Sequence, residues 1–180
     1  MTATTSQLLT VAEFRALPLD DGPVYHELRR GEVVSVTRPK YKHAVIQRRL
    51  RRLLENAAPP EGVVDTEFAY RPLPEYELRV AGVAYVSGIR EQVIDPEDNL
   101  QGAPDITIEV LSPSNTDAEI YDKEKLCLEH GAQEFWVVDP DRRQVKISMP
   151  DGHTVTWRSD QEIPLRLFGE AVLLVDAIFE

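Results

Sequence analysis

The sequence lacks most of the features that mark a secreted or membrane-embedded protein. Its single cysteine, Cys127, excludes an internal disulfide, which fits a reducing compartment. No apolar run approaches the ~20 residues that a bilayer-spanning helix needs. The opening stretch MTATTSQLLTVAEF has neither a basic leader nor a long apolar core, so nothing in it marks a secretory signal. We therefore expect a cytoplasmic protein that does not enter a membrane.

Several common catalytic and binding motifs are also missing. The four histidines form no HExxH pattern, and a lone cysteine cannot make a CxxC zinc site, which argues against a structural zinc. The nine glycines are scattered and form neither a Walker-type nor a dinucleotide-binding loop. No GxSxG motif is present. The chemistry of this chain must therefore be sought in its charged residues.

The chain is acidic, but one segment of it is basic. A length of 180 residues with 42% hydrophobic residues predicts one domain, residues 1–180, and a net charge of −11 argues against a general polyanion binder. Between Arg38 and Arg52 there are seven basic residues and no acid, among them Arg48, Arg49, Arg51 and Arg52. Such a run usually forms a solvated helix face. It becomes a phosphate-binding surface only if a site lies beside it.

Local patterns predict helices alternating with strands. Thr10 to Glu13 and Thr116 to Glu119 are capping boxes that open helices. Residues 43–57 have apolar residues at helical spacing. Strands are expected at 24–29 and 32–37 as a hairpin, and at 63–70, 76–86, 106–111, 134–138, 145–148 and 154–158, with a last apolar stretch at 171–179. The pattern predicts an α/β or α+β fold, a sheet with helices packed on it.

The stretch GAPDITIEVLSPS, residues 102–114, places two carboxylates in a strand that otherwise looks buried. Ile106, Ile108 and Val110 form one face, while Asp105 and Glu109 share the other. Four residues of strand separate the two acids by ~13 Å, too far for both to bind one ion. Directly opposite positions on a neighbouring strand lie only ~5 Å away, so a metal site at Glu109 would need a carboxylate from that strand.

Simpler interpretations of both acids remain open at this point. Glu109 could be a partly buried carboxylate satisfied by an arginine or by backbone donors. Asp105 follows Pro104 at the start of the strand, where an acid more often stabilises a turn than binds a metal.

The segment GAPDITIEVLSPSNTDAEIYDKEKLCLEHGAQEFWVVDP resembles the Uma-two family of restriction-endonuclease-like proteins, in the PD-(D/E)XK nuclease superfamily. TVAEFRALP, YHELRRGEVV and VAGVAYVSGIRE fall in the order and spacing of that family. The resemblance implies a restriction-endonuclease-like mixed β-sheet core flanked by helices, with additional β-hairpins. It also implies an endonuclease that cleaves DNA with Mg²⁺ or Mn²⁺, in which carboxylates hold the metal and a lysine assists. A homodimer would match the symmetry of duplex DNA.

The resemblance implies roles for four residues. Glu109 is the acid of the (D/E)XK half-motif, but Leu111 stands where the superfamily usually has lysine, and Lys123 on the following helix takes that part. Glu27 and His43 match the remaining polar positions. Each has a plainer alternative: Lys123 paired with Glu119 on the surface, His43 as a satisfied core histidine, and Glu27 as a hairpin acid paired with an arginine.

One departure from the family pattern affects the expected metal site. Where the family has Pro-Asp, with the aspartate as second ligand, this chain has Ala81-Gly82. Asp65 or Glu67 could reach the site if their strand is adjacent, whereas Glu77 should point to the opposite face. Two hypotheses follow: a metal-dependent nuclease impaired at Gly82, or a catalytically degenerate nuclease fold that serves as a DNA-binding or protein-interaction module. If Glu27 and His43 face the site, the arginine-rich helix becomes the expected DNA surface.

Overall fold

The computed structural model describes residues 8–19, 22–113 and 115–180, and its centre is one mixed sheet. The helices are α1 (Val11–Arg15), α2 (Tyr41–Ala57), α3 (Gly88–Glu91), α4 (Asp117–Glu129) and the 3-10 helices η1 (Arg166–Phe168) and η2 (Val175–Ile178). The strands are β1 (Val24–Arg29), β2 (Glu32–Thr37), β3 (Val63–Arg71), β4 (Arg79–Val86), β5 (Leu100–Gln101), β6 (Ile106–Val110), β7 (Glu134–Asp139), β8 (Gln144–Ser148), β9 (Thr154–Arg158), β10 (Glu162–Pro164) and β11 (Val172–Leu174).

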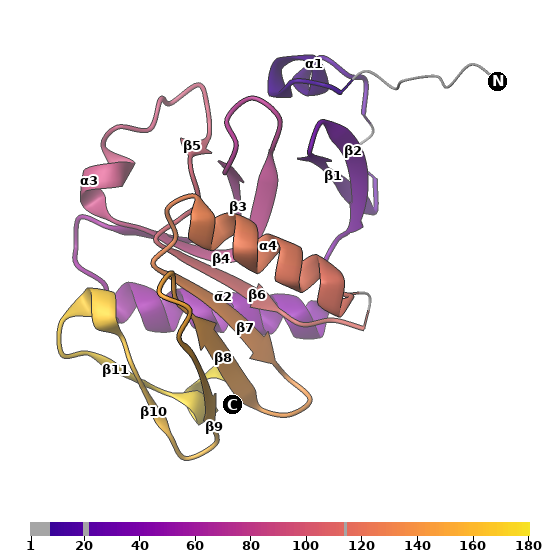
Figure 1. The fold of residues 1–180 in the computed structure, drawn as a ribbon. Helices are drawn as coiled ribbons and strands as arrows, with labels where there is room; N and C mark the ends of the chain where they lie inside the picture. Colours follow the sequence, from indigo (N-terminus) through magenta and orange to yellow (C-terminus); the bar gives the residue numbers. More distant parts are fainter. Residues whose placement is uncertain (1–7, 20–21, 114) are drawn as a thin grey trace.

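The large sheet has seven strands in the order β5-β3-β4-β6-β7-β8-β9 (Figure 1). Most neighbours are antiparallel, while β3 with β5 and β6 with β7 are parallel. The parallel β6 and β7 are connected through α4, as a parallel crossover requires. Two separate two-stranded sheets, β1-β2 and β10-β11, complete the fold. This confirms the predicted class: a mixed sheet flanked by helices, with additional hairpins.

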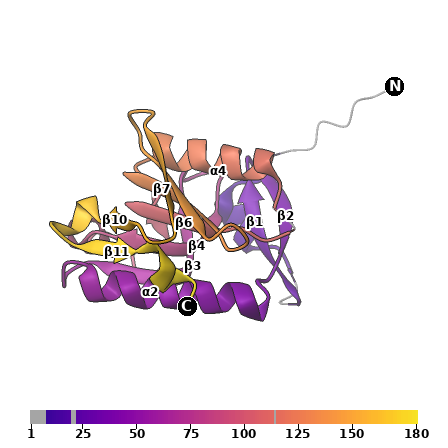
Figure 2. The same ribbon diagram turned by 90° about the horizontal axis from the view of Figure 1, so that it is seen from below.

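Helices α2 and α4 cover opposite faces of the sheet (Figure 2). The apolar side of β6 packs toward α2, where Ile106, Ile108 and Val110 join Leu50 and other buried residues in the main core cluster. A second cluster under α4 contains Cys127. The alternation of β6 therefore turns its apolar residues to one helix and Thr107 and Glu109 to the other. No helix in the described ranges is long and apolar enough to span a membrane.

The first hairpin forms as predicted because its turn suits tightly connected strands. Arg29 pairs with Glu32, leaving Arg30 and Gly31 as a two-residue loop. Both loop residues have positive φ, 51° and 78°. A type I′ turn requires positive φ at both of its central residues, and its twist matches the right-handed twist of the two strands that it connects. An isolated bridge from Leu28 to Leu78 then ties the hairpin to the chain just before β4. This contact sets β1 beside the sheet.

Both predicted capping boxes are present. Thr116 accepts a hydrogen bond from the Glu119 backbone while the Glu119 side chain accepts one from the Thr116 backbone, and Thr10 and Glu13 do the same for α1. The strand predicted from residue 76 begins instead at Arg79, because Glu77 and Leu78 bind the first hairpin. The last apolar stretch divides into β11 and η2.

Candidate active site

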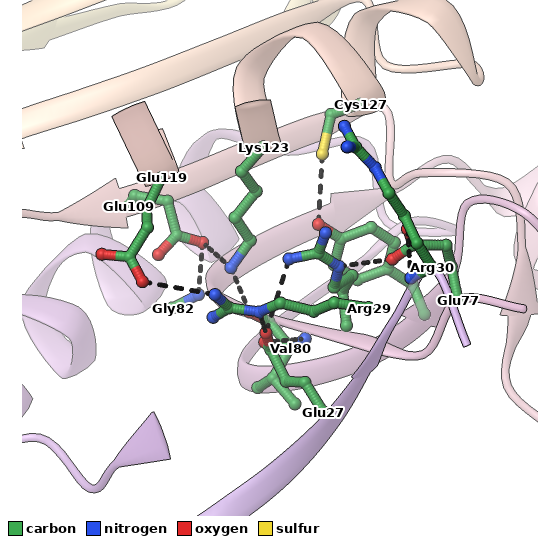
Figure 3. Close-up of polar contacts among 12 residues, drawn as sticks. Glu27, Arg29, Arg30, Glu77, Val80, Gly82, Glu109, Glu119, Lys123 and Cys127 are labelled. Carbon is green, nitrogen blue, oxygen red and sulfur yellow. Dashed lines mark hydrogen bonds and ion pairs between the residues drawn. The ribbon is translucent and has the colours of Figure 1, made fainter. Parts of the chain in front are cut away.

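The site lies where the pairing of β4 with β6 ends. Their ladder contains three residue pairs and stops at Val83 opposite Ile108, next to Gly82 and Glu109. Beyond that point, backbone groups of β4 bind side chains: Val80 N–H donates to Glu27, Val80 C=O accepts from Lys123, and Gly82 N–H lies 3.4 Å from Glu109 Oε1. At this end of β4, charged side chains from β1, β6 and α4 therefore bind backbone groups that a neighbouring strand would otherwise bind (Figure 3).

The Glu109–Lys123 ion pair is at the centre of the site. Lys123 Nζ is 2.7 Å from Glu109 Oε1 and donates to Val80 O at 2.5 Å. Lys123 is only 9% exposed, because its position on α4 points the side chain at the sheet. Burial acts to lower the pKa of Lys123, but the charges of Glu109 and Glu27 outweigh it and raise the pKa overall. Lys123 is therefore a buried cation, and the alternative of a surface pair with Glu119 is wrong.

Glu27 is almost fully buried at 1% exposure and satisfies β4 directly. Its Oε1 accepts from Val80 N–H at 2.9 Å, and its Oε2 accepts from Arg29 Nε at 2.8 Å. Burial acts to raise the pKa of Glu27, but the charges of Lys123, Arg29 and Arg79 lower it overall. Glu27 thus remains ionised, and its negative charge stabilises the nearby positive charges of Lys123, Arg29 and Arg79.

Arginines that the sequence reasoning did not single out complete this network. Arg29 joins Glu27 to Glu119, at 3.3 Å, and so connects β1 with the first turn of α4. Arg79 Nε lies 2.6 Å from Glu77 Oε2. The spacing Glu27-x-Arg29 was the available signal, because alternate residues of a strand share a face.

Tyr25 of β1 also belongs to this site. Burial, followed by the charges of Glu27, Glu109 and Glu67, strongly raises the pKa of its phenol. Tyr25 is therefore a neutral hydroxyl, and it lies on the same face of β1 as Glu27. The same alternation was the available signal, because Tyr25, Glu27 and Arg29 are alternate residues of one strand.

Neither Asp105 nor His43 forms a hydrogen bond or ion pair with Glu109 or Lys123 within the residues that the structure describes. Asp105 Oδ2 accepts from Ser87 N–H at 2.8 Å, and its Oδ1 is 3.2 Å from Arg90, so protein groups engage both oxygens. His43 is half-buried in the first turn of α2, and burial lowers the pKa of its ring. Within the described part of the chain, that ring makes no hydrogen bond or ion pair.

The four predicted DNA-binding arginines of α2 divide into two kinds. Arg49 donates to Ile178 O at 3.3 Å, and Arg51 donates to Val64 O at 3.2 Å, so both have structural partners. Arg48 and Arg52 are exposed, with Arg48 over the ring of Tyr41. Only part of the basic run is thus available as an outward-facing surface.

The residues at the site fit a weakly held divalent cation only in part. Glu109 offers carboxylate oxygens, the ligands that Mg²⁺ prefers, while Gly82 contributes none. The described residues contain no group of three or more His, Cys, Asp and Glu side chains arranged to hold a metal. Magnesium is often held by one or two protein carboxylates together with water and substrate phosphate, so the available donors are compatible with such binding.

The mixed sheet, its flanking helices and the acid–lysine pair at the open end of β4 and β6 define a restriction-endonuclease-like fold. The chain belongs to the Uma2 family, whose model is described as "Putative restriction endonuclease" and matches residues 11–174. This confirms the resemblance noted in the sequence.

A solved structure agrees with the family assignment at the level of the fold. The crystal structure titled "a putative nuclease belonging to DUF820" from Anabaena variabilis is 24% identical, with a TM-score of 0.80, and the match covers 95% of this chain and 97% of that one. At this identity the likeness establishes a shared fold. No curated protein matches the sequence significantly.

Proposed function

We propose that this protein is a divalent-metal-dependent endonuclease that hydrolyses DNA phosphodiesters. The observation that carries the proposal is the buried 2.7 Å pair of Glu109 and Lys123 at the end of the β4–β6 ladder. An acid and a lysine on one side of a sheet, at the point where two of its strands separate, suit the binding of a metal and a phosphate together. Membership of a family described as restriction endonucleases supports DNA as the substrate.

Each residue then has a defined part. Glu109 would hold Mg²⁺ or Mn²⁺, which when bound lowers the pKa of water and neutralises the phosphate. Lys123, protonated because of its raised pKa, donates to a phosphate oxygen and stabilises the negative charge of the transition state. Glu27 positions Lys123 by binding Val80, whose carbonyl accepts from the same ammonium. His43 is a supporting group from α2, and Asp105 stabilises the start of β6.

Cleavage of supercoiled plasmid tests this function. The wild type is expected to nick the plasmid with Mg²⁺ or Mn²⁺ and to stop when a chelator is added. Glu109→Gln should abolish nicking, and Lys123→Met should reduce its rate by about 100-fold, the cost of removing one transition-state donor. Asp122→Asn, an acid on the same helix as Lys123, is the matched control and should cleave as the wild type does. Metal-dependent cleavage that survives Glu109→Gln would refute the assignment.

A second candidate function rests on Gly82. Without a carboxylate at this position, the fold could bind DNA or a protein without cutting. In that case DNA affinity would persist in chelator, and neither Glu109→Gln nor Lys123→Met would change it. Binding measured in chelator together with an absence of cleavage would favour this alternative.

A further inference from the structure

We infer that Glu67 supplies the second carboxylate of the site, in place of the aspartate that the family has where this chain has Gly82. This inference rests on the proposed metal-dependent function and identifies one of its residues.

Glu67 stands on the strand next to Gly82, at the position opposite to it. Thr66 pairs with Val83 and Phe68 pairs with Ala81, so Glu67 lies directly opposite Gly82 on the neighbouring strand. That one pair is missing from an otherwise continuous ladder. Directly opposite residues of antiparallel strands are ~5 Å apart, a distance that a side chain spans easily. The carboxylate that this chain lacks at position 82 of β4 can thus be supplied from position 67 of β3.

The backbone of Glu67 explains the missing pair. Its φ is +52°, a left-handed value that is uncommon for a residue with a side chain. The strand therefore departs from regular pleating at the residue that faces Gly82, and the side chain of Glu67 need not follow the alternation of its neighbours.

The space above Gly82 is filled by the partner of Glu67. A Cβ atom at Gly82 would lie 2.9 Å from Gln47 Nε2 and 3.1 Å from Ile108 O. The same Gln47 nitrogen donates to Glu67 Oε1 at 2.7 Å. Gln47 is 3% exposed in α2, so its amide lies inside the protein beside these two strands. The Gln47–Glu67 pair therefore occupies the volume in which a side chain at position 82 would begin.

The charge of Glu67 interacts with Lys123 and Tyr25, as the charge of Glu109 also does. Desolvation raises the pKa of Glu67, the hydrogen bond from Gln47 opposes this, and the charge of Glu109 raises it further while Lys123 lowers it. The charges of Glu109 and Glu67 both raise the pKa of the Tyr25 phenol. Glu67 also keeps an exposed surface, and in the described residues only its Oε1 accepts a hydrogen bond. Its second oxygen is thus available to a ligand.

The other acid of β3 provides a matched control. Asp65 Oδ1 accepts from its neighbour Thr66 N–H at 2.8 Å and lies 3.8 Å from Arg51 Nε. It therefore turns toward α2 and Arg51, whereas Glu67 is bonded to Gln47.

Binding of Mn²⁺, followed by the electron paramagnetic resonance signal of the free ion, tests the inference without requiring cleavage. Glu67→Gln should weaken Mn²⁺ binding about tenfold or more, whereas Asp65→Asn should bind as the wild type does. Adding Gly82→Asp to Glu67→Gln should restore affinity, with the Gln47 amide moving aside and the Ile108 carbonyl shifting by a few tenths of an ångström to admit the new Cβ. Circular dichroism establishes that each variant is folded.

The outcomes separate this inference from the proposed function. If Glu67→Gln binds Mn²⁺ as the wild type does while Glu109→Gln does not, Glu67 is not a ligand and the metal-dependent function stands. If Glu109→Gln also binds like the wild type, or if the wild type binds no Mn²⁺, both are overturned. Loss of affinity in Asp65→Asn equal to that in Glu67→Gln would likewise overturn the specific role of Glu67.

Discussion

Glu109 is tolerated within a buried sheet because, although β7 pairs with it on one side, β4 no longer pairs with β6 on the other. The ladder to β4 ends one residue earlier, and Lys123 and the Gly82 N–H satisfy the carboxylate instead. Buried charges are costly unless they are paired and hydrogen-bonded, and here each charge meets an opposite one or a backbone group. At the scale of single residues, the site is therefore also part of the structure, and changes in it should affect stability as well as activity.

Glu27 should make a large contribution to stability that depends on pH. Its folded-state pKa lies below the usual 4.5, so its stabilising effect is present above that pH and is lost as the pH falls through the lower folded value. Replacing it by Gln removes the buried charge that pairs with Arg29, while Arg79 keeps Glu77, and should lower the free energy of unfolding by about 3 kcal/mol at neutral pH. Urea denaturation at several pH values measures this.

A control for that experiment is available on the surface. Glu55, half-exposed and paired with Arg51 four residues earlier in α2, should lose less than about 0.5 kcal/mol when replaced by Gln. Equal losses in the two variants, or a Glu27→Gln loss that does not diminish in acid, would contradict the role given to Glu27.

At the scale of elements, α4 and the first hairpin bring the site together. Helix α4 carries Lys123 on the side facing the sheet, and Arg29 ties the hairpin to the first turn of that helix through Glu119. Glu119 therefore serves twice: its carboxylate closes the capping box with Thr116 and also receives Arg29. The start of α4 thus fixes the position from which Lys123 reaches β4.

Removing the cap of α4 should weaken this arrangement. Thr116→Ala removes the hydroxyl that accepts from Glu119 N–H and should destabilise the protein by about 1 kcal/mol. Thr116→Ser retains the hydroxyl and should be nearly neutral. Thermal unfolding of both variants provides the measurement, and equal melting temperatures would show that the cap contributes nothing.

Local signals predicted the elements, but contacts distant in sequence decided the site. The capping boxes of Thr10 and Thr116 were legible because each depends on four consecutive residues. The position of Glu67 opposite Gly82 depends on the register of two strands and on Gln47 of a third element, none of which leaves a local pattern. For the same reason, the sequence indicated Asp65 and Glu67 equally as replacements for the missing aspartate.

At the scale of the whole molecule, charge is distributed unevenly over an acidic protein. A net charge of −11 coexists with a basic α2 on the face opposite to α4. Arg49 and Arg51 hold the C-terminal segment and β3, whereas Arg48 and Arg52 are exposed. Lys42 and Arg51 of α2 are exposed too but are paired with acids, so any attraction of α2 for a phosphate backbone depends chiefly on Arg48 and Arg52.

Neutralising Arg48 and Arg52 with Gln should weaken DNA binding and reduce its dependence on salt. Loss of two phosphate contacts should lower the slope of log affinity against log salt by about 1.8, from about 0.9 per contact. Fluorescence anisotropy of a labelled duplex in chelator measures both quantities. Replacing Lys125 and Arg158, exposed cations on other elements, is the control. An unchanged slope in the α2 variant would remove this helix from the DNA surface.

The most direct test of the central claim compares the wild type with Gly82→Asp in metal-dependent nicking of supercoiled plasmid. If Glu67 and Glu109 together form the site, the wild type nicks the plasmid in Mg²⁺ or Mn²⁺ without any change at position 82. If only Gly82→Asp nicks, Glu67 does not replace the lost aspartate and the natural chain is an inactive nuclease. If neither protein nicks, the nuclease assignment itself is contradicted.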